Sequence, residues 1–432
     1  MSQLLIAPAT QPLRGAMTVP GDKSITHRAL ILGALAEGHT RITGYSRGED
    51  CLNTLGVVRA LGINAQDFPE GLDVMGKGLW GLTEPSNVLD CGNSGTGLRL
   101  LAGVLAGQKF FSVLTGDASL RSRPMGRVVK PLRQMGATIS GRRGGDLAPL
   151  VIQGGALQPV SYESPVASAQ IKSCILLAGL FAEGMTAISE PMKSRDHTER
   201  MLQYLGVPVQ VDGCTVHVEG QRSFKGKPIV VPGDISAAAF FLVAASIVPD
   251  SEVLLTGIGL NPERTGILDV LSAMGADIAI LNSREVSGEP VGDLRVRATQ
   301  LKGTMIGPEL IPKTIDELPI LCVAAALADG ETRISGAQEL RVKETDRIHA
   351  MAVELAKIGV ILEEQPDGLV IQGKSTLRGG QCESYGDHRV VMSLAIAGLV
   401  AKESVVIEDV DCVETSFPGF HSKLLELLTN SQ

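Results

Sequence analysis

Apolar and polar positions along this chain repeat in an order that predicts alternating helices and strands. Each repeat has a Gly- or Pro-marked turn, an apolar helix, a turn of small residues and a strand rich in β-branched residues. The helix-and-strand part recurs at residues 29–43, 98–113, 175–188, 237–255, 321–334 and 394–407. Six copies of one pattern predict an α/β protein that arose by internal duplication.

A second helix follows in most copies and ends at a glycine that precedes an alternating strand. Leu61-Gly-Ile-Asn64 and Met274-Gly-Ala-Asp-Ile278 are two examples. Glycine suits the C-cap of a helix, and the residues after it suit a strand. The repeat length of about 70 residues exceeds that of common solenoids, which favours six α/β units over a stacked array.

One turn occurs twice and divides the six units into three and three. Val19-Pro-Gly-Asp-Lys-Ser24 is copied as Val231-Pro-Gly-Asp-Ile-Ser236, and each copy runs into an apolar helix. This duplication predicts two similar domains with a joint near Val230 and a cleft between them. The predicted first domain spans residues 21–230, and residues 231–432 belong to the second.

The first copy of this turn has the chemistry of an anion site. Ser24 and Arg28 lie four residues apart and share a helix face, with Lys23 just ahead of them. Two cations, a hydroxyl and a positive helix terminus suit a phosphate or a carboxylate. The second copy has Ile235 and Phe240 at the positions of Lys23 and Arg28, which indicates that the first copy is the functional one. Taken alone, the first copy also fits a capped core helix with two solvated cations.

Other polar clusters stand at the starts of helices or in loops. The remaining five starts of the repeated first helix are 92–99, 168–170, 233–236, 313–317 and 386–389. If the units are related by rotation, these termini face one region and form an anion trap. Arg121-Ser-Arg-Pro124 is predicted to lie in a loop, and Arg341-Val-Lys-Glu-Thr-Asp-Arg347 is predicted to open a helix with Lys343 and Arg347 on one face. A solvated helix start is the alternative for the latter.

Composition argues against several classes of function. The chain has 432 residues, a net charge of −8 and 3% aromatic residues, which argues against nucleic-acid binding. No apolar run is long enough to span a membrane, and the first residues do not resemble a signal peptide. The seven cysteines are scattered without metal-ligand or disulfide spacing, so we expect reduced thiols, a cytoplasmic location and no metal site.

One apparent nucleotide motif is set aside. Gly368-Leu-Val-Ile-Gln-Gly-Lys-Ser375 has the spacing of a phosphate-binding P-loop. Its middle is a strand-like apolar run, and Thr376-Leu-Arg-Gly-Gly380 does not favour a helix. ATP binding is therefore not expected there.

Several motifs together resemble one enzyme family over nearly the whole chain. They are Gly21-Asp-Lys-Ser-Ile-Thr-His-Arg28, Gly92-Asn-Ser-Gly-Thr96, Arg123-Pro124, Ser168-Ala-Gln170, Leu340-Arg-Val-Lys-Glu-Thr-Asp-Arg347 and Asp387-His-Arg389. The chain is similar to 5-enolpyruvylshikimate-3-phosphate synthases of the shikimate pathway, which serves aromatic amino acid biosynthesis. Gly116-Asp-Ala-Ser-Leu120 and Ser194-Arg-Asp-His-Thr-Glu199 look like the bacterial class II branch.

The resemblance implies an architecture. Members of this family have two domains, each of three βαβαββ units in an inside-out α/β barrel, and the domains close over the substrates. It also implies that the N-terminal strand, up to about Pro20, belongs to the second domain. The expected domains are therefore 21–230, and 1–20 together with 231–432.

The resemblance also implies an activity without metal or cofactor. The family transfers the enolpyruvyl group of phosphoenolpyruvate to the 5-hydroxyl of shikimate-3-phosphate and releases phosphate. The implied shikimate-3-phosphate ligands are Lys23, Ser24, Arg28, Ser168, Ala169, Gln170, Arg195, Asp316 and Lys343. The implied phosphoenolpyruvate ligands are Lys23, Gly95, Arg123, Gln170, Arg347, His388 and Arg389. Asp316 is expected to take the 5-hydroxyl proton, Glu344 to protonate the methylene carbon, and Lys23 to share in proton transfer.

The chain departs from the class I pattern at two places. Thr415 stands where class I members have a lysine two residues before Phe-Pro, which puts one phosphoenolpyruvate contact in doubt. A class I tyrosine after the third-unit strand is also missing, and Arg195 is expected to serve that region. The expected inhibitor is glyphosate, because Gly95 stands where tolerant class II members have alanine. We expect a monomer without a nucleic-acid or membrane partner.

Two other functions compete with this one. The sister enolpyruvyl transferase that acts on UDP-N-acetylglucosamine typically carries a reactive cysteine in a first-domain loop, and Leu120-Arg-Ser-Arg-Pro-Met125 has none. A non-catalytic anion-binding protein would explain the helix starts but not Asp316 and Glu344.

Overall fold

The computed structural model describes residues 2–429, and the chain divides into two compact units. The N-terminal unit comprises Gly21–Pro232 and Glu285–Glu289. The C-terminal unit comprises the chain up to Pro20, Gly233–Arg284 and the chain from Pro290 onward. The short segment at 285–289 groups with the N-terminal unit. Its contacts there include Val230 N, which donates to Ser287 Oγ at 3.0 Å, Arg200 Nη1, which donates to Gly288 O at 3.4 Å, and His197 Nδ1, which lies 2.8 Å from Glu289 Oε1.

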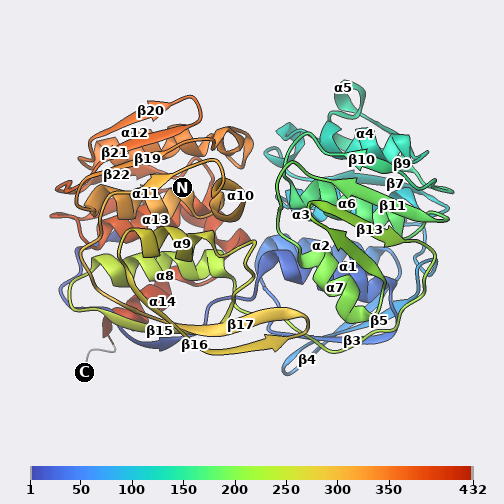
Figure 1. The fold of residues 1–432 in the computed structure, drawn as a ribbon, viewed down its shortest axis with the longest axis horizontal. Helices are drawn as coiled ribbons and strands as arrows, with labels where there is room; N and C mark the ends of the chain where they lie inside the picture. Colours follow the sequence, from blue (N-terminus) through green and yellow to red (C-terminus); the bar gives the residue numbers. More distant parts are fainter. Residues whose placement is uncertain (1, 430–432) are drawn as a thin grey trace. The chain divides into compact units, whose positions relative to one another are not determined.

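The N-terminal unit has three four-stranded sheets and their helices (Figure 1). The first sheet has the order β14-β3-β5-β4, from Ile229–Val230, Glu37–Thr43, Gly71–Lys77 and Asn64–Phe68, with helices α1 (Lys23–Leu35) and α2 (Glu49–Ala60). The second has the order β6-β7-β9-β8, from Leu89–Asp90, Phe111–Thr115, Leu147–Gln153 and Thr138–Gly141, with α3 (Gly95–Ala106), η1 (Leu120–Ser122), α4 (Gly126–Gln134) and α5 (Arg142–Gly145). The third has the order β10-β11-β13-β12, from Ser161–Glu163, Met185–Ser189, Thr215–Glu219 and Val209–Asp212, with α6 (Ala169–Gly179) and α7 (His197–Leu205).

The C-terminal unit has three further sheets. The fourth sheet has the order β16-β17-β15-β2, from Asp277–Val286, Glu289–Arg297, Glu252–Gly259 and Arg14–Met17, with α8 (Ile235–Ile247) and α9 (Gly266–Ala273). The fifth has the order β18-β19-β21-β20, from Met305–Ile306, Glu331–Ile334, Gly368–Gln372 and Leu362–Gln365, with α10 (Ile311–Thr314), α11 (Leu318–Leu327), η2 (Gln338–Val342) and α12 (Arg347–Lys357). The sixth has the order β1-β23-β22, from Gln3–Ile6, Val405–Glu408 and Gly380–Glu383, with α13 (His388–Gly398), η3 (Val410–Thr415) and α14 (Phe420–Thr429).

The predicted βαβαββ pattern is clearest in the second sheet. β6 pairs in parallel with β7 across α3, and β9 pairs antiparallel with both β7 and β8. The sixth sheet departs from the pattern, because β1 from the start of the chain pairs antiparallel with β23 in place of a hairpin. The strand β2 likewise pairs in parallel with β15 and completes the fourth sheet.

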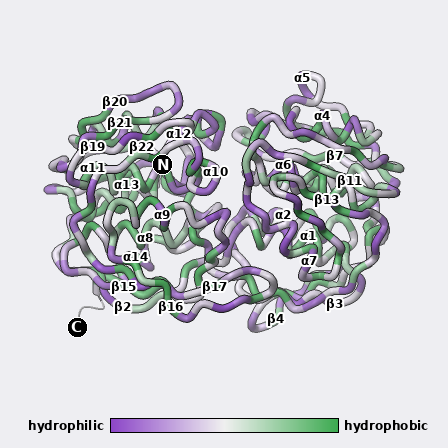
Figure 2. Tube along the Cα trace, viewed as in Figure 1, coloured by the Kyte–Doolittle hydropathy of each residue, from purple (hydrophilic) through white to green (hydrophobic). Residues whose placement is uncertain are grey.

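The repeated first helices form the interior of each unit. In α8, twelve of the thirteen residues are buried, as expected for a helix that is apolar on every side. The strands bury one face only: in β3, Thr40 and Ile42 are buried while their neighbours Arg41 and His39 are exposed. Figure 2 shows hydrophobic residues in the helices and strands of both units and hydrophilic residues in many of the connections.

Side chains at the turns start these helices. The first helix of five units is capped by its own turn residue, which accepts a hydrogen bond from a backbone N–H of the first helical turn; these residues are Asp22, Ser94, Ser168, Asp234 and Asp387. In the remaining unit, Glu317 precedes α11 and makes no such cap. The P-loop-like segment forms strand β21 and an irregular connection, as its apolar pattern predicts. None of the helices among residues 2–429 is both long and apolar enough to cross a membrane.

Candidate active site

Arg28 joins three helices of the N-terminal unit at one point. Its Nε donates to Thr198 Oγ1 and its Nη2 to Ser173 Oγ, both at 2.6 Å, and its Nη1 donates to Ser24 O at 2.8 Å. Burial lowers the pKa of Arg28 to about 10, and the nearby charge of Arg195 contributes to the lowering. The structure therefore brings Ser24 and Arg28 to the region of Arg195, with a buried cation that favours an anionic partner.

Lys23 stands at the first position of α1, beside Arg28's helix face. Its Nζ lies 2.9 Å from Asp50 Oδ2 in the first turn of α2. Both side chains are mostly buried, at 17% and 9% exposure. The ammonium is thus held at the helix start by a carboxylate, in a position that also suits a phosphate.

The turn at Gly95 meets the guanidinium groups of two arginines. Arg123 Nη2 donates to Asn93 Oδ1 at 2.7 Å and to Ser119 Oγ at 3.0 Å. A Cβ built on Gly95 would lie 2.9 Å from Arg99 Nη1 and 3.5 Å from Arg123 Nη1. A side chain at this position would therefore crowd the guanidinium groups, and the glycine avoids that contact.

Gln170 connects this turn to α6. It accepts a hydrogen bond from Arg99 Nη1 at 2.5 Å and donates to Thr96 Oγ1 at 2.9 Å. Arg99 Nη2 also donates to Pro124 O at 3.0 Å. The structure thus brings together Gly95, Arg123 and Gln170, all three of which the resemblance implied as phosphoenolpyruvate ligands.

Arg99 is a residue that the sequence reasoning did not assign. It follows Gly95 by four positions, as Arg28 follows Ser24 in the first unit. That shared spacing on duplicated helices was the signal available in the sequence.

Glu190 is a second unassigned residue, and it holds the start of α6. Its Oε1 accepts from Ser168 N at 2.7 Å, and Ser194 Oγ donates to it at 2.7 Å. Lys172 Nζ lies 3.0 Å from Glu190 and 2.8 Å from Glu199. Burial lowers the pKa of Lys172, but the two carboxylates outweigh it and the net shift is upward. Glu190 therefore fastens the Ser168 turn to the loop that carries Arg195.

In the C-terminal unit, cations surround the Asp316 carboxylate. Its Oδ1 lies 3.5 Å from Lys343 Nζ and 3.6 Å from Arg347 Nη1, and its Oδ2 lies 3.2 Å from Arg264 Nη1. Arg389 Nη1 donates to the backbone oxygen of Asp316 at 2.8 Å. An ionised carboxylate with such neighbours can accept a proton from a substrate hydroxyl held beside it.

Arg347 links Glu344 to the start of α13. Its Nη2 donates to Glu344 Oε2 at 2.6 Å and its Nε to Asp387 Oδ2 at 2.7 Å. Burial lowers the pKa of Arg347, but the charges of Asp387 and Glu344 outweigh it and raise the pKa above its usual value. Glu344 thus lies beside a permanent cation.

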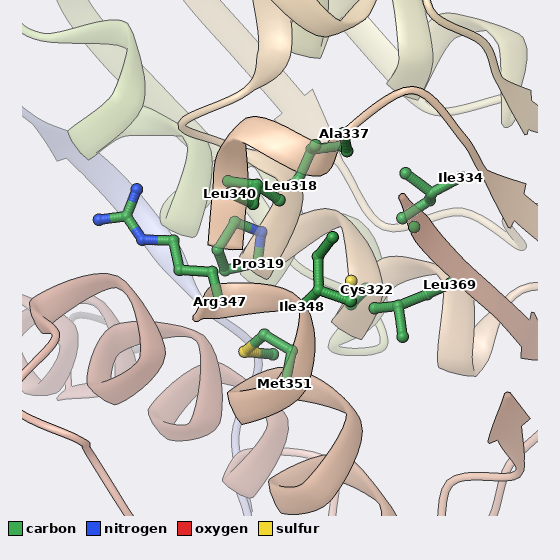
Figure 3. Close-up of a pocket in the computed structure, with 11 residues that line it drawn as sticks. Leu318, Pro319, Cys322, Ile334, Ala337, Leu340, Arg347, Ile348, Met351 and Leu369 are labelled. Atoms are coloured by element: carbon green, nitrogen blue, oxygen red, sulfur yellow. The ribbon is translucent and has the colours of Figure 1, made fainter. Parts of the chain in front are cut away.

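An apolar pocket lies beside Arg347. Leu318, Cys322, Ile348 and Met351 line this pocket together with Arg347, as Figure 3 shows. Leu340, in η2, lines it as well. Arg347 thus lines an apolar pocket, while its guanidinium pairs with Glu344 and Asp387.

One predicted element boundary was wrong. The sequence placed Lys343 and Arg347 on one face of a helix, but α12 begins at Arg347. Asp346 caps that helix by accepting from His349 N, so Lys343 and Glu344 lie in the connection after η2. The two cations still meet, because both approach Asp316.

The remaining residues that the sequence singled out lie at the starts or ends of helices. His388 is buried at the first position of α13, next to Arg389, whose N–H is capped by Asp387. Ala169 is the first residue of α6. Thr415 ends η3, where its hydroxyl donates to Cys412 O at 2.6 Å. Among residues 2–429 no group of three or more His, Cys, Asp or Glu side chains could hold a metal ion.

The chain matches one known family over nearly its whole length. The family model for EPSP synthase (3-phosphoshikimate 1-carboxyvinyltransferase) matches residues 8–424. The 3-phosphoshikimate 1-carboxyvinyltransferase of Geotalea uraniireducens (strain Rf4) is 56% identical over 420 residues, covering 97% of this chain and 98% of that protein. The protein of the same name from Geobacter sulfurreducens (strain ATCC 51573 / DSM 12127 / PCA) is 55% identical over 412 residues, covering 95% and 96%.

Solved structures extend the comparison to the fold. The EPSP synthase of Acinetobacter baumannii has a TM-score of 0.88 at 44% identity and covers 98% of both chains. The enolpyruvyl transferase NikO from Streptomyces tendae has a TM-score of 0.77 at 17% identity, covering 98% of this chain and 97% of that one, a likeness of fold alone. The predicted two-domain α/β fold is confirmed.

Proposed function

Because this chain belongs to the EPSP synthase family of enolpyruvyl transferases, we propose the following roles for its residues in transferring the enolpyruvyl group of phosphoenolpyruvate to the 5-hydroxyl of shikimate-3-phosphate. Asp316 accepts the proton of the attacking hydroxyl, and Glu344 delivers a proton to the methylene carbon. The 5-oxygen bonds to the carbon that bears the phosphate ester. Loss of phosphate and of one methyl proton from that adduct restores the double bond, so that phosphate is the second product.

The observation that carries these roles is the charge arrangement around Asp316. Its carboxylate lies within 3.6 Å of Lys343, Arg347 and Arg264, and Arg347 in turn pairs with Glu344. Two carboxylates that share the cation Arg347 provide a base and an acid for one reaction centre.

The two substrates are assigned to sets of residues with matching charge. Shikimate-3-phosphate is proposed to contact Lys23, Ser24, Arg28, Ser168, Ala169, Gln170, Arg195, Asp316 and Lys343. Phosphoenolpyruvate is proposed to contact Lys23, Gly95, Arg123, Gln170, Arg347, His388 and Arg389. Arginine forks suit the phosphate and carboxylate groups of both ligands, which supports the assignment. Lys23 shares in proton transfer.

Three finer properties belong to the same proposal. Glyphosate inhibits the enzyme by occupying the phosphoenolpyruvate site against Gly95. The protein acts in the cytoplasm and as a monomer. Light scattering of the purified chain at assay concentration tests the monomeric state by giving the molecular mass. The domain boundaries are proposed at 20/21 and 230/231, the second two residues before the division between Pro232 and Gly233.

The activity test is release of phosphate from phosphoenolpyruvate that depends on added shikimate-3-phosphate. Replacing Asp316 with Asn or Glu344 with Gln should lower kcat by about a hundredfold or more, the usual scale for acid–base groups. Binding of shikimate-3-phosphate, measured by calorimetry, should change much less. Near-normal kcat in both variants would show that the chemistry lies elsewhere.

The same assay separates the alternatives. The transferase for UDP-N-acetylglucosamine would release phosphate with that sugar nucleotide and not with shikimate-3-phosphate. An anion-binding protein without catalysis would bind both ligands and release no phosphate. The family match and the relatives favour the shikimate-3-phosphate reaction over both.

A further inference from the structure

Both copies of the duplicated turn, Val19–Ser24 and Val231–Ser236, make an ion pair, but from different positions and with opposite charge. In the first copy the turn supplies the cation: Lys23 Nζ lies 2.9 Å from Asp50 Oδ2, near the start of α2. In the second copy the turn supplies the anion: Asp234 Oδ1 lies 3.3 Å from Arg264 Nη2, just before α9. The second turn therefore presents a carboxylate to a buried guanidinium.

Arg264 reaches from this turn to the proposed catalytic base. Its Nη2 donates to Ser236 Oγ at 2.7 Å, and its Nη1 donates to Asp316 Oδ2 at 3.2 Å. The side chain is only 5% exposed. Lys343 and Arg347 approach the other oxygen of the same carboxylate, Oδ1. Arg264 thus contacts Asp316 at a different oxygen from these two cations.

Glu317 fastens the same segment to the turn. It precedes α11 but does not cap it; its carboxylate instead accepts a hydrogen bond from Ser236 Oγ. Glu317 is buried, and burial raises its pKa, with the neighbouring charge of Asp316 acting in the same direction. The start of α11 is therefore tied to residues 234–236 both through Glu317 and through Arg264.

We propose that Arg264 is a positioning residue that holds the Asp316 carboxylate in its reactive orientation, and that the second copy of the turn serves as its anchor. A planar fork with divergent N–H groups can bond Asp316, Ser236 and Asp234 at once, which an ammonium cannot do with the same geometry. The inference rests on the proposed role of Asp316. It gives the second turn a task in catalysis, although that turn lacks the cations of the first.

The test is a double-mutant cycle between Arg264→Gln and Asp316→Asn, with kcat and KM measured for both substrates. A base displaced by about 1 Å loses about a hundredfold in rate, so Arg264→Gln should lower kcat by roughly tenfold to a hundredfold. KM for both substrates should stay within about twofold, because Arg264 acts through Asp316. In the Asp316→Asn background the same change should lower kcat by no more than about twofold, since coupled residues are not additive.

Arg264→Lys and Arg297→Gln complete the set. Arg264→Lys keeps the charge and should recover part of the kcat lost in Arg264→Gln. Thermal unfolding checks that each variant is folded. If Arg264→Gln is not folded, the kcat of Arg264→Lys tests the proposal instead. Arg297 pairs with Glu252 at the surface, with exposures of 45% and 44%, and its replacement should leave kcat unchanged. An equal fold loss in both backgrounds, a change in KM alone, or unchanged kcat in both Arg264 variants would overturn the proposal. Near-normal kcat in Asp316→Asn would instead overturn the role of Asp316, and the inference with it.

Discussion

His27 shows how burial fixes the protonation of a single residue beside the candidate site. It is fully buried in α1, with Nδ1 2.8 Å from Thr54 Oγ1 and Nε2 3.2 Å from Ser94 Oγ. Thr54 Oγ1 donates its hydrogen to Asp50 O, so it accepts from Nδ1 of His27, and the Ser94 hydroxyl then donates to Nε2. Burial, and then the charges of Lys23 and Arg28, lower the pKa of His27 to about 3.

This shift predicts a loss of stability in acid. The unfolded chain binds a proton at His27 below its usual pKa of 6.5, whereas the folded chain does not until about 3. The free energy of unfolding should therefore fall as pH drops from about 6.5 toward 3, by up to about 1.4 kcal/mol per pH unit from this group. Urea unfolding at pH 7.5 and at pH 5 measures this fall in the free energy of unfolding. In His27→Asn the difference between the two pH values should be smaller; an unchanged difference would contradict the assignment.

Gly95→Ala should confer resistance to glyphosate. The new Cβ would lie 2.9 Å from Arg99 Nη1, which holds Gln170, so either the cation moves or the ligand space shrinks. Overpacking of this kind costs about 1–3 kcal/mol, or roughly five- to over a hundredfold in glyphosate affinity. Phosphoenolpyruvate is shorter and should lose less. Inhibition curves at fixed phosphoenolpyruvate compare wild type, Gly95→Ala and, as a control remote from the ligand space, Gly56→Ala. A wild type unaffected by millimolar-range glyphosate would refute the proposal.

At the scale of the elements, small residues set how closely the interior helices approach. A Cβ on Gly103 of α3 would lie 2.2 Å from Cys174 O of α6, so any larger side chain forces the two helices apart. Gly56 of α2 has no atom within 4 Å of its Cβ position and is exposed. Alanine at these two positions should therefore have opposite effects on stability.

These positions make a matched pair of alanine substitutions. Gly103→Ala should lower the free energy of unfolding by about 1–3 kcal/mol through overpacking. Gly56→Ala should raise it by about 0.4–1 kcal/mol, because alanine restricts the unfolded chain and meets nothing in the fold. Denaturant unfolding of both variants gives the comparison. Equal effects would mean that helix propensity, and not the close approach, decides both sites.

At the scale of the whole molecule, the start of the chain completes sheets whose other strands come much later. Strand β1 pairs with β23 from Gln3↔Glu408 to Ile6↔Val405, and β2 pairs with β15. Both pairings belong to the C-terminal unit. The two units therefore depend differently on the first residues.

Deletion of Ser2–Ala9 should affect only one unit. Hydrogen exchange should become faster in β23, which loses its partner β1, because its edge N–H and C=O groups are then open to water. Amides of β5 in the N-terminal unit should keep their protection. Mass spectrometry of peptides from both strands gives the answer, and an equal loss of protection in β5 would contradict this division of the chain.

The sequence by itself determined the repeated units, the starts of their helices and the family. These depend on local signals: the apolar pattern of each helix and a capping side chain such as Asp22 or Asp234 within its own turn. The candidate site residues also came from motifs, through the resemblance, and their roles stay a prediction that the contacts within each unit support. The start of α12 was misjudged because Asp346, and not an earlier residue, caps it.

Only the tertiary structure decided which distant side chains meet. Arg99 and Gln170 are 71 positions apart, and Arg264 and Asp316 are 52 apart. Nothing in either local pattern specifies these partners, because the direction of a long side chain depends on how neighbouring helices pack around it. A charged residue before α9 looks like a solvated surface residue in the sequence. Burial next to Asp234 and Asp316 is what makes Arg264 a candidate positioning residue for Asp316.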